Sequence, residues 1–67
     1  MNFSKNFKEL RLSTKTPQKD IAEYLNVSVR AIQRYERGDT EPTFEQLVLI
    51  AKFFNVSTDY LLGVKDS

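Results

Sequence analysis

Apolar residues recur along this chain at steps of three and four, the period of α-helices that bury one face. Three segments show the pattern, and the first runs from about Phe3 to Ser13. Their inward positions are Phe3, Phe7, Leu10 and Thr14, then Ile21, Ala22 and Leu25, and then Leu47, Ile50, Ala51 and Phe54. No stretch alternates between apolar and polar residues as a half-buried strand does. The pattern therefore predicts an all-α protein.

Residues that start and stop helices divide the chain into five short segments. Thr16 as N-cap and Pro17 as first helical residue predict the second helix start, and Asn26 its end. The remaining signals are Ser28 and Gly38 around a third helix, a Thr43–Gln46 capping box for a fourth, and Ser57 and Gly63 around a fifth, which turns Leu61 and Leu62 inward. We expect one compact five-helix domain over residues 1–67, with a loose tail at 64–67.

The connection between the second and third helices is only about three residues long, Asn26, Val27 and Ser28. A link this short, with an apolar residue that must be buried, forces the two helices to cross steeply. That geometry is the helix-turn-helix.

The third helix, at about 29–37, has two chemically different sides. At about 100° per residue, Ile32 and Tyr35 share a side with Ser28, and Ala31 lies at its margin. The opposite side consists of Val29, Arg30, Gln33, Arg34 and Arg37. One interpretation is an ordinary solvated face. The absence of any carboxylate among these five residues favours the other interpretation, a face that meets an anionic partner.

Two charged residues lie on the inward sides of their helices. Arg11 is about 40° from Phe7 on the first helix, and Glu36 is about 40° from Ile32 on the third. A charge that faces a core is costly unless it is paired. We therefore predict an Arg11–Glu36 ion pair between the helices; the alternative is that each side chain reaches water separately.

Composition narrows the classes of function. The chain has no cysteine and no histidine, so thiolate metal sites, disulfides and the usual neutral-pH general base are missing. No nucleophile–base pair or metal-ligand cluster is visible, so we expect neither an enzyme nor a cofactor or metal site. Without an apolar run of signal-peptide or membrane-spanning length, the sequence predicts a soluble, cytoplasmic protein with no membrane contact.

The small net charge of +1 hides an asymmetry between the two halves. Residues 1–38 hold eight basic and four acidic residues, a balance of +4, whereas residues 39–67 hold two basic and five acidic ones, a balance of −3. Such asymmetry indicates that the first half meets an anionic surface.

The motifs of the chain, in order, resemble the helix-turn-helix domains of the phage repressor/Cro type, the XRE family, over about residues 5–63. The matching pieces are "Q-x-x-[IL]-A-x-x-[IL]" at Gln18–Leu25, "VS" at 27–28, "I-x-x-[YW]-E-x-G" at Ile32–Gly38, and "EPTFEQLVLIAKFFNVSTDYLLG" through the last two helices. The resemblance implies a five-helix fold whose third helix enters the DNA major groove. It also implies the Arg11–Glu36 pair that the helical periodicity indicates.

Site residues follow from the resemblance position by position. It implies that Val29, Arg30, Gln33 and Arg34 meet base edges, and that Gln18, Ser28 and Arg37 lie at phosphates. Lys15 joins the phosphate set through its charge. The implied function is that of a transcriptional regulator, a repressor. The implied partner is double-stranded DNA with a palindromic operator, which a homodimer would bind. The alternative is an interaction module of the same fold, an antitoxin or adaptor, whose basic face binds an acidic protein.

Several positions depart from the usual family pattern. Pro17 occupies the usual Ser/Thr cap position, and Lys15 and Thr16 replace a frequent Gly–Leu pair. Asp39 stands where a basic residue would assist a phosphate contact. Leu49 and Phe53 are apolar where the family is often polar or small, which fits either ordinary surface residues or a dimer contact.

Overall fold

Five helices form the protein in the computed structural model, which describes residues 2–65. They are α1 (Phe3–Ser13), α2 (Gln18–Leu25), α3 (Val29–Arg37), α4 (Phe44–Phe54) and α5 (Thr58–Leu62). The described residues contain no strand, so the all-α prediction is confirmed. Of the tail expected at 64–67, residues 66 and 67 lie outside the described range, and the Val64 N–H donates to the Asp59 carbonyl at 2.9 Å.

Most of the predicted helix boundaries are confirmed by their capping contacts. The side chains of Ser28 and Ser57 accept a backbone N–H at the starts of α3 and α5, and Thr43 and Gln46 form the complete capping box. Asn26 and Gly38 close α2 and α3 in the left-handed conformation, at φ 59° and 79°. Each cap satisfies backbone groups that the helix leaves unpaired, so short helices end where the sequence indicates.

The predicted start of the second helix was wrong by one residue. Pro17 is the N-cap, with extended backbone at ψ 149°, and no side chain caps α2. Thr16 cannot cap it because it belongs to the end of α1: its N–H donates to the Arg11 carbonyl, and its hydroxyl lies 2.8 Å from that of Thr14. Thr14 itself is exposed and follows the last residue of α1, so it is not part of the inward face.

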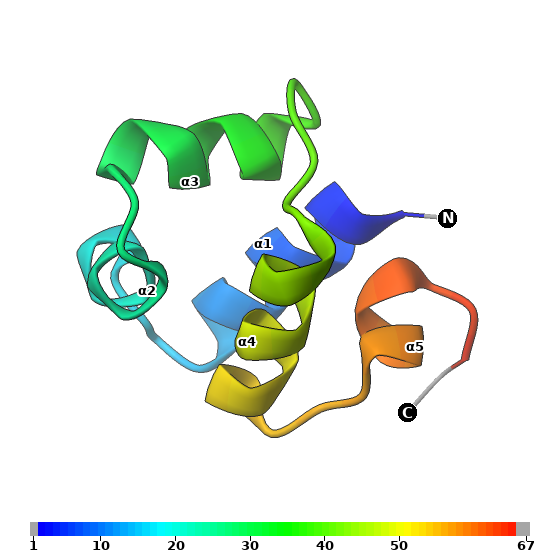
Figure 1. Ribbon diagram of the computed structural model, residues 1–67. Coiled ribbons are helices and arrows are strands. Elements are labelled where there is room, and N and C mark those ends of the chain that lie inside the picture. The colour runs from blue at the N-terminus through cyan, green and yellow to red at the C-terminus, as the bar shows by residue number, and fades with distance from the viewer. Residues whose placement is uncertain (1, 66–67) are drawn as a thin grey trace.

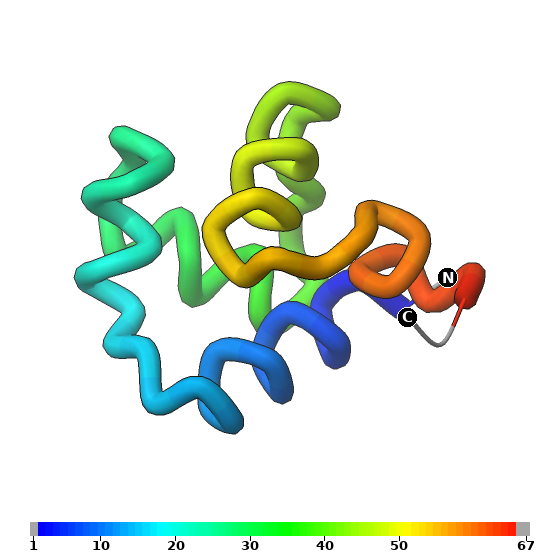
Figure 2. The backbone as a smooth tube through the Cα atoms, turned by 90° about the horizontal axis from the view of Figure 1, so that it is seen from below, coloured from blue at the N-terminus to red at the C-terminus, as the bar shows by residue number. Residues whose placement is uncertain are grey.

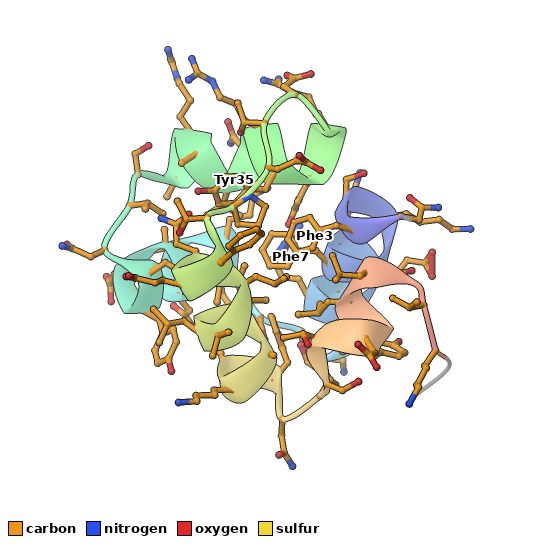
Figure 3. The ribbon with its side chains drawn as sticks, turned by 45° about the vertical axis from the view of Figure 1, so that its right-hand side comes forward. Phe3, Phe7 and Tyr35 are labelled. Atoms are coloured by element: carbon orange, nitrogen blue, oxygen red, sulfur yellow. The ribbon has the colours of Figure 1, made fainter. Side chains whose placement is uncertain are left out.

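The centre of the core receives one fully buried side chain from each helix. These residues are Phe7, Ile21, Ile32, Ile50 and Leu61. The ring of Phe3 stacks on that of Phe7 with centroids 5.2 Å apart, and both lie near Tyr35 in the middle of the molecule (Figure 3). Because all five helices share one core, the position of each helix depends on the others.

The arrangement leaves one long side of α3 without a neighbouring helix. Helix α3 contacts α1 and α2, while α4 contacts α2 and α5. In Figure 1, α3 runs across the top of the molecule and α2 is seen almost end-on, so the two helices cross steeply as predicted. Viewed from below, α4 lies between α2 and α5, and α3 is on the far side of α4 (Figure 2).

Candidate nucleic-acid interface

The outward side of α3 is exposed along its whole length. Ile32 and Tyr35 are buried on the opposite side, as the helical period predicts. The exposed residues are Val29, Arg30, Gln33, Arg34 and Arg37. Long side chains with nitrogen at their tips extend upward from the α3 ribbon, away from the body of the protein (Figure 3). The structure thus presents a cationic helix face that no other described element covers.

Contacts near both ends of α3 hold this face in place. At the start, the Ala31 N–H donates to the Ser28 hydroxyl at 3.1 Å. Toward the end, the Tyr35 hydroxyl donates to Gln46 Oε1 at 2.8 Å, and the same oxygen accepts the Thr43 N–H. The capping box of α4 is therefore also the anchor of α3.

Arg11 and Glu36 form an ion pair beneath the cationic face. Their side chains are only 11% and 5% exposed. The guanidinium engages both carboxylate oxygens, through Nε to Oε2 and through an Nη2 bond of 3.1 Å to Oε1, and Nη1 donates to the Thr16 carbonyl. These charge-assisted bonds tie α1, the turn before α2, and α3 together. The two side chains do not reach water separately.

Gln18 extends this network in a way that sequence reasoning missed. Its Nε2 donates to Glu36 Oε1 at 3.1 Å, and its Oε1 accepts from Gln33 Nε2 at 3.3 Å. The family resemblance predicts that both glutamines contact DNA, with no contact between them. Their mutual bond joins positions 15 residues apart, so it becomes visible only once the packing of α2 against α3 is known.

The side chains predicted to contact phosphates differ in whether they already bond to other groups of the protein. Lys15 is exposed, and its side chain forms no ion pair with any of the described residues. Arg37 Nε, in contrast, donates to Asp39 Oδ2 at 3.0 Å on the surface. Ser28 is exposed, with its hydroxyl engaged as the α3 cap. Gln18 begins α2, whose N-terminus has no side-chain cap and so keeps its first N–H groups available to an anion.

Lys15 adopts the left-handed conformation, with φ 56°, which costs a residue with a Cβ roughly 1–2 kcal/mol. We expect Lys15→Gly to raise the free energy of unfolding by about 0.5–1 kcal/mol, because glycine tolerates this conformation. The same change is expected to weaken DNA binding by removing a cation. Urea unfolding and DNA titration measure the two effects. Lys15→Ala is the control, since it removes the ammonium but keeps the strained conformation; stabilisation by both variants would contradict the explanation.

The apolar surface of α4 lies elsewhere on the molecule. Phe44 is 89% exposed, and with Glu45, Val48 and Leu49 it lines an open hollow of about 430 Å³. Phe53 is half-buried and packs edge-on against Tyr24, with centroids 5.0 Å apart. Phe53 therefore already has a partner within its own chain, and Leu49 is the more exposed of the two residues considered for a dimer contact.

The described residues contain neither a helix that could span a membrane nor a cluster of side chains that could hold a metal ion. No helix between residues 2 and 65 is both long and apolar enough to cross a membrane. The same range holds no group of three or more His, Cys, Asp or Glu residues placed to bind a metal ion.

Comparison with known proteins identifies the family. A model described as "Helix-turn-helix" matches residues 7–61. The HTH-type transcriptional regulator ImmR of Bacillus subtilis is 40% identical over 63 residues, covering 94% of this chain and 50% of ImmR. The HTH-type transcriptional activator BcrR of Enterococcus faecalis is also 40% identical, over 94% of this chain and 31% of BcrR. The chain thus spans half the length, or less, of these two relatives.

A solved structure agrees over nearly the full length of both chains. The P22 c2 repressor protein, crystallised in complex with a synthetic operator, superposes with a TM-score of 0.82 at 32% identity, covering 88% of this chain and 89% of the repressor. The chain belongs to the helix-turn-helix family, of the phage repressor/Cro type.

Proposed function

We propose that this protein is a transcriptional regulator that binds double-stranded DNA at specific sequences, with α3 in the major groove. The observation that carries the proposal is the exposed, carboxylate-free side of α3, held from beneath by the Arg11–Glu36 pair. A major groove about 12 Å wide admits an α-helix. A free cationic helix fixed rigidly on a small domain has the shape and charge that this groove requires.

Base recognition rests on four side chains of the exposed face. Arg30 and Arg34 carry guanidinium forks that match the two acceptors of guanine, O6 and N7. Gln33 offers an amide donor and acceptor, which match adenine. Val29, 38% exposed at the start of the helix, provides an apolar surface for a thymine methyl group. Together these residues read up to four positions of one half-site.

Phosphate contacts complete the interface at its edges. Lys15 and Arg37 supply positive charge, and Gln18 and Ser28 supply polar groups at the starts of α2 and α3. Such contacts add affinity and fix the register of the protein on the duplex, but they carry no sequence information. The chemistry requires no cofactor and no catalytic step.

The proposal also covers the oligomeric state of the protein and whether it represses or activates transcription. The P22 c2 repressor was solved with a synthetic operator, which supports operator binding by this chain. We propose further that the protein binds a palindromic operator as a homodimer, since a two-fold protein matches a two-fold DNA site. Likeness to this repressor over most of its length favours repression. We also propose a cytoplasmic location, which is consistent with binding to chromosomal or phage DNA.

Selection of bound sequences from random duplex DNA tests the function. We expect an enriched motif with two inverted half-sites about one helical turn apart. Motifs without inverted symmetry would leave DNA binding intact and overturn the dimer. The absence of any enriched motif would overturn sequence-specific binding.

The salt dependence of binding provides a second test. We expect the association constant for the selected duplex to fall as salt rises, because bound cations release counterions from DNA. Lys15 and Arg37 alone predict a log–log slope of roughly −2 per protomer, at about −0.9 for each phosphate neutralised. Fluorescence anisotropy between about 50 and 200 mM salt measures this slope. Affinity that does not change with salt would contradict an electrostatic interface.

A further inference from the structure

Four side chains form a continuous hydrogen-bonded relay from the interior of the protein to the exposed side of α3. The relay consists of Arg11, Glu36, Gln18 and Gln33, with bonds of 3.1 Å from Gln18 to Glu36 and 3.3 Å from Gln33 to Gln18. It begins at an almost fully buried carboxylate and ends at an exposed amide. Only its last member lies on the exposed face of α3.

The chemistry of the relay fixes the orientation of each amide in turn. The Glu36 carboxylate can only accept hydrogen bonds, so Gln18 must direct its Nε2 toward it. The Oε1 of Gln18 then points toward Gln33, and because this oxygen accepts, Gln33 must donate from its own Nε2. A reversed Gln33 amide would bring two acceptor oxygens together. The buried charge thereby determines which end of an exposed side chain is the donor.

With respect to residues 2–65, the orientation leaves Gln33 with one N–H and its Oε1 free, because an amide nitrogen carries two donors. A donor and an acceptor side by side match adenine N7 and N6 in the major groove. A freely rotating Gln33 amide would also adopt the reversed orientation, in which its Oε1 faces adenine N7 and two acceptors meet. The fixed amide therefore discriminates between base pairs better than a free one.

We propose that Gln18 and Glu36 are positioning residues for base recognition and that they act through Gln33, without touching the base themselves. This inference rests on the proposed DNA-binding function. It adds a second role to Gln18, beyond the phosphate contact at the start of α2. It also makes the base preference at the Gln33 position a property of the relay rather than of Gln33 alone.

The test compares base preference, rather than absolute affinity, at each operator position. Wild-type protein is expected to discriminate by roughly 5- to 150-fold at the position that Gln33 reads. Gln18→Met keeps the length of the side chain and cuts the relay, and we expect it to reduce that ratio below about threefold. Preferences at the positions read by Arg30 and Arg34 are expected to stay within about twofold of wild type.

Two control variants distinguish a loss of Gln33 positioning from a general loss of DNA affinity. Lys15→Ala removes a phosphate contact, so it is expected to weaken binding to all sequences by one common factor. Gln33→Ala removes the reader, so adding Gln18→Met to it is expected to change base preference no further. Loss of the Gln18 phosphate contact adds a common factor for all sequences, so the inference depends on the ratio between bases. An unchanged base preference in Gln18→Met, or a preference change that persists without Gln33, would overturn the inference.

A measurement without DNA tests the relay independently of the proposed function. ¹⁵N relaxation of the Gln33 side-chain amide is expected to show restricted motion in the wild type and free rotation in Gln18→Met. Equal mobility in both proteins would overturn the relay. If the wild type bound no duplex DNA while the amide were still restricted, the proposed function would fail and the relay would stand as a structural feature.

Discussion

Glu36→Gln is expected to lower the free energy of unfolding by about 3 kcal/mol, because removing one partner of a buried ion pair leaves an uncompensated charge. The Glu36 side chain is 5% exposed and receives donors from Arg11 and Gln18. A glutamine amide at this position would turn an N–H toward one of those donors. For a domain of this size the melting temperature is expected to fall by at least about 10 °C. Thermal unfolding followed by circular dichroism, and urea titration, measure the loss.

An exposed glutamate on a neighbouring helix provides the matched control. Glu23 lies on the solvent side of α2, and Glu23→Gln is expected to change stability by no more than about 0.5 kcal/mol. Adding Arg11→Met to Glu36→Gln is expected to cost less than the sum of the two single changes, since it removes the unpaired guanidinium. A loss in Glu36→Gln no larger than that in Glu23→Gln would show that the pair contributes little.

The helices were predictable from the sequence because their signals are local. Ser28, Thr43 and Ser57 cap helices through bonds to residues three positions further on, a distance that the sequence displays directly. The exception, Thr16, shows the limit of this reasoning. Its groups bond back to Arg11 and Thr14 at the end of α1. The end of α1 and the start of α2 therefore compete for the same residue, and the sequence signals for one helix do not show which end takes it.

The candidate site was predictable to a lesser degree. The outward side of α3 and the ion pair beneath it follow from helical period and the cost of an unpaired buried charge. The contacts of Gln18 and Arg37 cannot be predicted from the helical period or from the cost of an unpaired charge. Gln18 bonds to two residues of α3, and Arg37 bonds to Asp39 just beyond its own helix. Those partners depend on the packing of α2 on α3 and on the path of the following loop, which the periodicity of one helix does not contain.

Replacing Arg30 and Arg34 together with alanine is expected to lower the affinity for the selected operator by at least about 100-fold, since each good guanine contact contributes roughly 1–3 kcal/mol. Both residues are exposed, so the free energy of unfolding is expected to change by less than about 1 kcal/mol. Each single change is also expected to relax the preference at one base position. Anisotropy titration with operator duplexes that carry single base-pair changes measures both effects.

The same double variant separates DNA binding from the alternative of a protein-interaction module. Lys52→Ala combined with Lys65→Ala removes the same amount of charge from the acidic half of the chain, away from α3, and is expected to change operator affinity less than threefold. Equal losses in both double variants would mean that net charge, rather than recognition by α3, determines binding. If the wild type bound duplex DNA of every sequence equally and an acidic protein tightly through Arg30 and Arg34, the cationic face would belong to an antitoxin or adaptor. A loss confined to the arginine variant and dependent on the base sequence is the result that only a helix reading the major groove would produce.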